Sequence, residues 1–326
     1  IFFLATLFIL HKYHFYRIGG NGFSMTMPTE KKWERIMQVQ VKTVTTSDQQ
    51  TLCVKTWGDE KKTPLVLVHG YPDNQEVWEP IIEKLVNDYF VVTYDVRGAG
   101  LSSIPKRIKH YRLPRLSLDL QEVVDQVLPN RNFHMAAHDW GSIQSWESAT
   151  EPKLKGRLLS YTTISGPCLD HASLYLREKF KSAPSNVLKM LTKSWYIGAF
   201  HLPLLAPTAW TFFSPEKWGK ILSGLEKKQD LPLNANIVAD GKYGINLYRA
   251  NFIPSLTQPR QRYAQCPVQA IVLKRDAFVS PEYITESMPK WVEEFEYVEL
   301  DANHWAVLSQ PEKIADYIRQ FIVKNA

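Results

Sequence analysis

From residue 38 onward, short apolar runs rich in β-branched residues alternate with segments whose apolar residues recur at helical spacing. Continuous apolar runs are typical of strands covered on both faces, and their alternation with helices is typical of a mostly parallel sheet. The runs that predict such strands are 65–68, 90–94, 133–137, 159–164, 268–273 and 295–300. The pattern therefore predicts an α/β fold.

Two earlier runs, 39–45 and 51–57, alternate in character across a polar turn and predict an antiparallel hairpin at a sheet edge. With this hairpin the sheet has eight strands. Apolar residues at helical spacing predict helices at 116–128 and 314–322 that lie against the sheet.

The alternation stops between residues 167 and 263, where the sequence is aromatic-rich and helical in character, without a clear strand. We interpret this segment as a helical cap inserted after the sixth strand. Residues 38–166 and 264–326 then form the α/β core. A length of 326 residues fits one core with one large insertion.

The first residues form a purely apolar run, 1–10, followed by Lys12 and Arg17. Ten residues are too few to span a bilayer. Three interpretations of residues 1–27 stay open: a truncated membrane anchor, a remnant of a secretory signal, or an extension foreign to the native protein. Membrane contact through residues 1–20 would be an addition to the activity of a cytoplasmic protein.

Composition excludes several classes of function. The hydrophobic content of 44% is typical of a globular protein. The net charge is +6, but Lys and Arg do not gather in a run long enough to follow a phosphate backbone. We therefore expect no nucleic-acid partner. Cys53, Cys168 and Cys266 are far apart and form no CxxC pair, so we expect reduced thiols and neither a disulfide framework nor a zinc site. The oligomeric state is left open.

The strongest chemical motif is FHMAAHDWGS at 133–142, a strand followed by a tight turn and a helix. Such a nucleophile elbow exposes one side chain, here Asp139, at the carboxyl edge of the sheet. Ala137, Gly141 and Ser142 supply the small neighbours that the turn requires. A carboxylate needs no deprotonation and can attack an sp³ carbon directly. The alternative is that Asp139 merely caps the following helix.

The sequence His69-Gly70-Tyr71-Pro72 follows the predicted strand 65–68. We predict that the backbone N–H groups of Tyr71 and Trp140 form an oxyanion hole. Gly70 allows the backbone to approach closely, and Pro72 stiffens the turn, for which a cis peptide bond is one route. Alone, the motif is equally compatible with an ordinary turn between a strand and a helix.

A base and an acid complete the predicted triad. His304 lies after the last strand and before the terminal helix, and Asp276 is the first carboxylate after the strand 268–273. We predict that His304 activates water and that Asp276 orients it. Asp170, after the preceding strand, is the fallback acid. We expect neither a cofactor nor a metal.

In this order, the motifs HGYPDNQEVW, YDVRGAGLSS, HDWGS and NHW resemble the epoxide hydrolase and haloalkane dehalogenase branch of the α/β-hydrolase family. The resemblance runs from about residue 40 to the end of the chain. It implies the α/β-hydrolase fold and hydrolysis of an epoxide to a vicinal diol through an aspartyl ester. It also implies two cap tyrosines as proton donors, Tyr196 and Tyr248, although His201 stands where the family commonly has Gln.

The expected substrate is a small apolar epoxide, which reacts with water. We expect His69, Trp78, Trp195 and Trp305 to contact it. The cap aromatics Trp195, Trp210, Phe212 and Phe213 also favour an apolar substrate, unless they only pack the cap. Substrate identity and stereochemistry are left open.

Three other functions are alternatives to epoxide hydrolysis. A haloalkane dehalogenase would share the triad and also Trp140, whose ring N–H could bind halide. Tyr71, however, stands where many dehalogenases have Asn as the second halide donor. A cap tryptophan, Trp195 or Trp210, could substitute for it. Asp at the elbow disfavours a serine esterase. A non-catalytic ligand-binding protein of the same fold is the alternative from a different class, which the complete triad disfavours.

Overall fold

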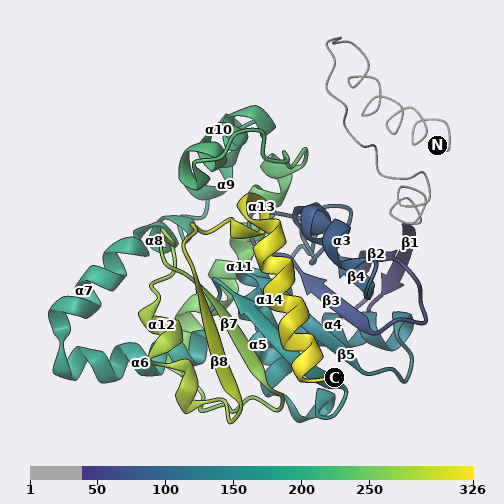
Figure 1. The fold of residues 1–326 in the computed structure, drawn as a ribbon. Coiled ribbons are helices and arrows are strands. Elements are labelled where there is room, and N and C mark those ends of the chain that lie inside the picture. The colour runs from purple at the N-terminus through teal and green to yellow at the C-terminus, as the bar shows by residue number, and fades with distance from the viewer. Residues whose placement is uncertain (1–38) are drawn as a thin grey trace, which may run out of the picture. The chain divides into compact units, whose positions relative to one another are not determined.

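The structure is a computed structural model that describes residues 39–326, apart from the side chains of Asn186, Lys189, Leu191, Lys193 and Trp195. An eight-stranded sheet in the order β1-β2-β4-β3-β5-β6-β7-β8 lies at its centre (Figure 1). The strands are β1 (Gln40–Thr45), β2 (Thr51–Trp57), β3 (Pro64–Val68), β4 (Phe90–Tyr94), β5 (Phe133–His138), β6 (Leu158–Ile164), β7 (Val268–Leu273) and β8 (Phe295–Leu300).

The sheet is mostly parallel, as predicted. β1 and β2 form an antiparallel hairpin, β2 is antiparallel to β4, and all other neighbouring strands are parallel. Every predicted strand is present, with ends that shift by at most one residue. The prediction succeeds because β3, β4 and β7 are buried along their whole length, which requires the continuous apolar runs seen in the sequence.

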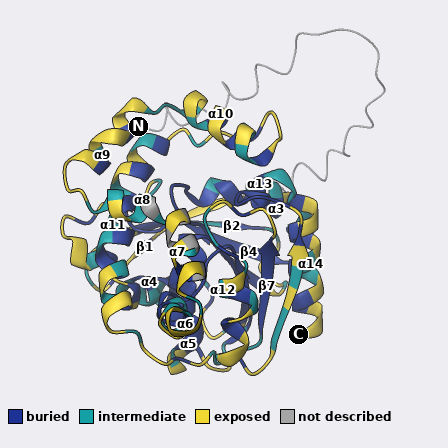
Figure 2. Cartoon of the chain, turned by 90° about the vertical axis from the view of Figure 1, so that its left-hand side faces the viewer, coloured by how far each residue is buried: buried dark blue, intermediate teal, exposed yellow. Residues whose placement is uncertain are grey.

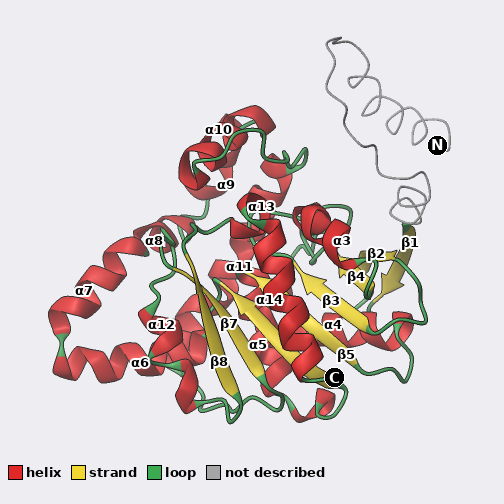
Figure 3. Ribbon diagram, in the orientation of Figure 1, coloured by secondary structure: helices red, strands yellow, loops and turns green. Residues whose placement is uncertain are grey.

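Helices cover both faces of the sheet (Figures 1 and 3). One layer contains α3 (Glu79–Leu85), α13 (Ala306–Ser309) and α14 (Pro311–Lys324), and the other contains α4 (Leu113–Val127) and α5 (Trp140–Thr150). The predicted helices at 116–128 and 314–322 correspond to α4 and α14. β3, β4, β5 and β7 are buried along their whole length, the edge strand β1 is largely exposed, and α4 and α14 expose their outer faces (Figure 2). Short helical turns are η2 (Gln75–Trp78), η3 (Ile108–Tyr111), η4 (Pro152–Leu154), α12 (Glu282–Thr285) and η6 (Met288–Lys290).

A helical cap follows the sixth strand, as predicted. Its elements are α6 (Leu169–Ser182), α7 (Pro184–Lys193), α8 (Trp195–Phe200), α9 (Leu205–Ala209), η5 (Trp210–Phe212), α10 (Pro215–Glu226) and α11 (Ile237–Thr257). α11 is fastened to the core by Asn251, whose side chain accepts from Leu113 N at 2.9 Å and donates to Tyr111 O at 2.8 Å. The long cap helix therefore has a fixed position over the sheet.

Within the described residues, no helix combines the length and the apolar character needed to cross a bilayer. The apolar run 1–10 lies outside the described residues. The interpretations of residues 1–27 and of membrane contact through 1–20 therefore stay predictions. Cys53, Cys168 and Cys266 are free thiols.

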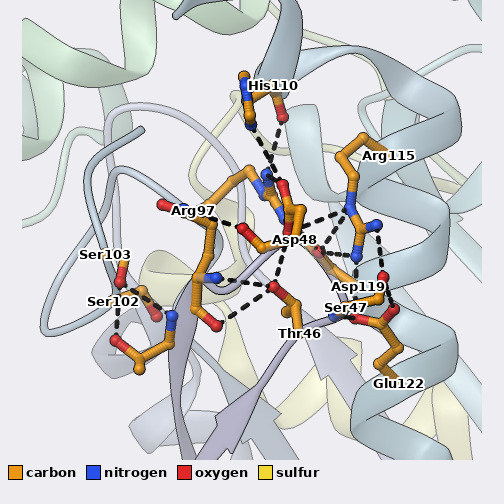
Figure 4. Close-up of polar contacts among 12 residues, drawn as sticks. Thr46, Ser47, Asp48, Arg97, Ser102, Ser103, His110, Arg115, Asp119 and Glu122 are labelled. Atoms are coloured by element: carbon orange, nitrogen blue, oxygen red, sulfur yellow. Dashed lines mark hydrogen bonds and ion pairs between the residues drawn. The ribbon is translucent and has the colours of Figure 1, made fainter. Parts of the chain in front are cut away.

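A buried ion-pair network supports the loop after β4 (Figure 4). The fully buried Arg97 donates to both oxygens of Asp119, with Nε 2.6 Å from Oδ2, and also to Asp48 at 2.9 Å. In the same loop, Val96 N donates to the ring of His69 at 2.8 Å. The network thus holds the loop after β4 in place, and through Val96 this loop fixes His69 in the turn after β3.

Replacing Arg97 with Met should destabilise the fold by about 3–5 kcal/mol, because the buried Asp119 would lose both hydrogen bonds from Arg97 and keep only the less buried Arg115 as a cationic partner, at 3.1 Å. Chemical denaturation monitored by circular dichroism measures the effect. The control is Arg275→Met, which removes an exposed ion pair with Asp301 and should cost no more than ~1 kcal/mol. Equal losses in the two variants would contradict the assigned role of Arg97.

Candidate active site

The three side chains of the predicted triad follow the carboxyl ends of parallel strands. In the register between β3 and β5, Val68 lies opposite Ala137, so the turns after these two strands begin at the same level. β6, β7 and β8 continue the sheet on the other side of β5. Because parallel strands end at one edge, residues far apart in the sequence meet there.

The turn between β5 and α5 is strained. Asp139 has φ 52° and ψ −123°, a conformation that L-residues rarely adopt. The two strand ends also approach so closely that a Cβ atom at Gly70 would lie 2.5 Å from Asp139 Oδ1, and one at Gly141 would overlap the backbone of His69. The predicted elbow is therefore present, and its small neighbours are required sterically.

The Asp139 carboxylate faces the predicted oxyanion hole. Tyr71 N donates to Asp139 Oδ1 at 2.7 Å, and the Tyr71–Pro72 peptide bond is cis. Trp140 is the first residue of α5, so its N–H has no partner inside the helix. The side chain of Asp139 thus lies next to the helix N-terminus, which favours negative charge.

His304 lies between two carboxylates. Its Nε2 is 3.4 Å from Asp139 Oδ2, and its Nδ1 is 3.1 Å from Asp276 Oδ1. Burial by itself lowers the pKa of His304, but Asp276 and Asp139 outweigh burial and raise this pKa to about 10. The structure therefore brings together the three residues that the sequence placed in a triad.

Asp276 is held as a charged group. Its Oδ1 accepts from Phe278 N at 2.8 Å and from Val279 N at 3.0 Å. Burial raises the pKa of Asp276, but His304 and these hydrogen bonds have the greater effect, and the pKa lies below the usual value. A permanently ionised Asp276 is suited to orient an imidazole and to stabilise its positive charge.

Sequence reasoning missed Ser165. It follows β6 directly, has φ 53°, donates to Asp276 Oδ2 and lies 2.7 Å from His304 Nδ1. Its hydroxyl therefore joins the acid and the base on the side away from Asp139. The one sequence signal was its place after a strand that ends beside the nucleophile strand.

Two predicted substrate contacts prove to be supporting residues. His69 is buried, accepts from Val96 N at 2.8 Å and bonds its own loop at Gly70 O at 2.9 Å. Both ring nitrogens are thus occupied, and burial lowers the pKa of His69. The side chain of Trp78 is fully buried in the core. Neither residue lines the cavity described below.

Trp305 also lies outside the cavity lining. Its ring N–H donates to Asp73 at 2.9 Å, and its backbone N donates to Glu226, the last residue of the cap helix α10, at 2.8 Å. Trp305 thus joins cap and core behind His304. The sequence analysis did not single out His138. It also supports His304, because its ring Nε2 lies 2.8 Å from His304 O.

Asp170, the fallback acid, is part of a different group. It accepts from Arg260 at 3.0 Å and lies 3.8 Å from Arg262, both at the end of the cap. Asp170 therefore belongs to the ion pairs that fix the cap exit, and Asp276 is the partner of His304. The side chain of Trp195 lies outside the described residues, so its predicted contact with substrate stays a prediction.

A cavity of about 420 Å³ lies between the cap and the elbow. Asp139, Tyr196 and Tyr248 all line it, together with mainly apolar side chains that include Trp140, Ile143, Leu169, Leu176, Phe252 and Phe278. This volume lies within the range of roughly 300–1,000 Å³ that is common for small-molecule sites. The cavity can hold an apolar molecule in contact with the carboxylate.

Tyr196 from α8 and Tyr248 from α11 are neighbours, with ring centroids 6.1 Å apart. Burial raises the pKa of both phenols above the usual value, and the negative charge of Asp139 adds to the effect. Both are therefore protonated at neutral pH and can act as hydrogen-bond donors inside the cavity.

His304 should make folding stability depend on pH. The pKa is raised from 6.5 to about 10 in the folded state. Protonation therefore stabilises the fold fully below pH 6.5, and this contribution is lost as the pH rises towards 10. We expect the free energy of unfolding to fall across this window in the wild type and to fall less in His304→Gln. Denaturant titrations at several pH values would contradict the assignment if both proteins gave the same slope.

Known proteins resemble this chain in sequence and in fold. A family model for the alpha/beta hydrolase fold matches residues 63–192. The "Probable oxidoreductase EphD" of Mycobacterium tuberculosis is 28% identical over 307 residues, which cover 90% of this chain and 50% of that protein. The chain thus spans about half the length of this relative. "Epoxide hydrolase 3" of Xenopus tropicalis is 25% identical over 283 residues, covering 82% of this chain and 73% of that protein.

Solved structures agree with the topology. An epoxide hydrolase mutant from Vigna radiata superposes with a TM-score of 0.71 at 22% identity, covering 88% of this chain and 99% of that one. The Bacillus megaterium epoxide hydrolase in complex with an inhibitor gives a TM-score of 0.68 at 20% identity, covering 87% and 99%. The chain therefore has the α/β-hydrolase fold and resembles proteins named epoxide hydrolases.

Proposed function

We propose that the protein hydrolyses an apolar epoxide to a vicinal diol through an ester on Asp139. One observation carries the proposal: a carboxylate at a nucleophile elbow and two protonated phenols line the same cavity. Relatives that bear the name epoxide hydrolase support it. We further propose that residues 167–263 act as the cap over a core formed by 38–166 and 264–326.

In the first step, an oxygen of Asp139 attacks a ring carbon of the epoxide and the carbon–oxygen bond of the strained ring breaks. The electron pair of that bond goes to the epoxide oxygen, which takes a proton from Tyr196 or Tyr248. An alkoxide is a poor leaving group, so a donor on this oxygen is needed. The product is a neutral alkyl ester of Asp139.

In the second step, His304 removes a proton from water, and the resulting hydroxide attacks the carbonyl carbon of the ester. The N–H groups of Tyr71 and Trp140 stabilise the negative oxygen of the tetrahedral intermediate. When the acyl–oxygen bond of the ester breaks, the leaving alkoxide takes the proton of the newly formed Asp139 carboxyl group. The diol then leaves with an oxygen that came from Asp139, and the carboxylate is restored. The phenolate left by the first step regains its proton from protonated His304 before water is activated, so His304 is neutral when it acts as a base and protonated again at the end of the cycle.

Esterification favours the second step electrostatically. In the resting protein, both Asp276 and Asp139 raise the pKa of His304. The ester carries no charge, so one of these two contributions disappears. The pKa of His304 falls at the stage that needs a neutral imidazole as a base.

The triad and Trp140, which lines the cavity, would serve a dehalogenase equally well, so the second halide donor distinguishes the two activities. Tyr71 occupies the position considered for a second halide donor, and its hydroxyl donates to Gly241 O at 3.1 Å. Trp210, one of the two tryptophans that could substitute, is buried and is not part of the cavity lining. A purely ligand-binding role would leave the complete triad unexplained.

The order of bond formation can be read from oxygen labelling. In a single turnover of styrene oxide in H₂¹⁸O, we expect the label in Asp139 and an unlabelled diol, detected by mass spectrometry of the peptide and the product. Label in the diol would instead mean direct attack of water on the epoxide and would overturn the proposal.

Substitutions separate the steps. Asp139→Ala should lower the rate of diol formation by at least ~10⁴-fold, as expected for loss of a nucleophile. Tyr248→Phe should lower it by roughly 10²–10⁴-fold, the usual contribution of a general acid. His304→Gln should accumulate the ester, seen as a protein mass increased by that of the substrate. A bromoalkane serves as the discriminating substrate: bromide release that survives Tyr248→Phe without diol formation would favour the dehalogenase.

A further inference from the structure

The cap exposes an unusual amount of apolar side chain. We define the cap surface as six exposed apolar residues of the cap: Leu202, Leu204, Leu205, Phe212, Ile253 and Leu256. The side chains of Leu204, Leu205 and Phe212 are the most exposed of these, at 80%, 70% and 71%. No Asp, Glu, Lys or Arg occurs between residues 194 and 215. Single exposed apolar residues need no explanation, but a grouped set marks an interaction site.

Hydrogen bonds join the parts of this surface. Arg249 of α11 donates from Nε to Phe200 O at 2.7 Å and from its terminal nitrogen to Leu202 O at 2.8 Å. This fastens the turn after α8 to α11. Ile253 lies four residues after Arg249, on the same side of the helix. The surface therefore extends from the turn along α11.

The surface is continuous with the cavity of the candidate active site. Ile253 and Leu256 are 56% and 46% exposed, and both also line the cavity. His201, beside Leu202 in the turn, is a third lining residue. The cavity thus opens at the cap surface, and an apolar molecule held there would meet the opening.

Cations surround the surface. Lys217 donates to Phe212 O at 2.8 Å, Arg249 to Leu202 O, and Arg177 to Leu256 O at 2.6 Å. Each is bound to the backbone of an apolar segment, and none forms an ion pair with a carboxylate among the described residues.

The cap region as a whole is also positively charged. Residues 167–263 contain 13 Lys or Arg against six Asp or Glu, a net charge of +7, whereas the whole chain has a net charge of +6. In Figure 2, the cap helices α6, α9 and α10 carry many exposed residues on their outer sides. The cap is thus the cationic part of a chain that is otherwise close to neutral.

We propose that the cap surface docks on an anionic lipid membrane. Leucine and phenylalanine side chains at the level of the headgroups would bury apolar area, while the surrounding cations pair with lipid phosphates and carboxylates. The long side chains of Lys and Arg can keep their charge in the headgroup layer while their aliphatic stems contact apolar groups. The combination of both contributions favours an anionic bilayer over a neutral protein partner.

Docking would direct the cavity opening at the bilayer, where apolar molecules concentrate. Delivery of an epoxide from the membrane rests on the proposed function, whereas docking itself does not. Vesicle binding is therefore measured without turnover, so that failure of one proposal is distinguishable from failure of the other.

The test is flotation of the full chain with vesicles of phosphatidylcholine, alone or with about 30% phosphatidylserine. We expect the wild type to float with the anionic vesicles. The double variant Leu204→Asp/Leu205→Asp should bind them at least roughly tenfold more weakly, because two inserted side chains become charged. Val323→Asp, which alters a residue that is 70% exposed on α14, is the matched control and should bind as the wild type does.

A second variant tests the cations. Lys217→Glu should weaken binding to anionic vesicles severalfold, and salt of about 0.5 M should weaken the wild type similarly. The segment 1–38 is identical in the wild type and all variants. Any contribution of this segment to vesicle binding therefore cancels when the variants are compared with the wild type. Thermal unfolding at the wild-type temperature confirms that the variants are folded.

Three results would overturn docking on a membrane: equal binding of the wild type and the double variant, equal binding to neutral and anionic vesicles, or no binding at all. Light scattering provides a further check. A wild-type dimer that dissociates in the double variant would reassign the cap surface as an interface between copies of this chain.

Discussion

The site depends on one backbone turn. Asp139 leaves the sheet at φ 52°, and this turn is possible only because the turn after β3 and the start of α5 carry no side chain at Gly70 and Gly141. Gly166, after β6, also has no room for a side chain, because a Cβ atom there would overlap Asp139 O. The carboxylate is thus held at a fixed point at the sheet edge by close packing of backbone, which a flexible loop could not achieve.

Charge at this point is balanced by neighbours from four other parts of the fold. Tyr71 N bonds one oxygen of Asp139 and His304 faces the other, while Asp276 and Ser165 hold the far side of the imidazole. The neutral histidines His69 and His138 hold the surrounding loops without adding charge, since burial lowers the pKa of both. One protonated imidazole between two carboxylates is therefore the resting arrangement.

The cap is attached to the core by buried polar contacts that lie near the site. Asp240 of α11 accepts from Gly100 N at 2.8 Å and from Asn74 at 3.1 Å, and burial raises the pKa of Asp240 to about 6. Glu226 of α10 binds the loop of His304 through Trp305 N. These contacts keep Tyr196 and Tyr248 over the nucleophile, while the outer side of the cap stays apolar and cationic.

The sequence by itself determined the strands, the elbow and the order of the triad. Strands buried on both faces require continuous apolar runs, and the carboxyl ends of parallel strands meet at one edge, so Asp139, Asp276 and His304 could be assigned from local pattern and position. The cap tyrosines were assigned only through a family resemblance, because helical spacing does not reveal which aromatic residue faces a cavity.

Only the tertiary structure decided which side chains line the cavity and which support it. His69, Trp78 and Trp305 stand beside motifs in the sequence, yet packing from distant segments occupies or buries them. Ser165 has no motif, and its role exists only because β6 ends between β5 and β7. The direction in which a side chain points depends on the residues packed around it. Folding brings these residues together from distant parts of the sequence, so the local sequence pattern does not reveal them.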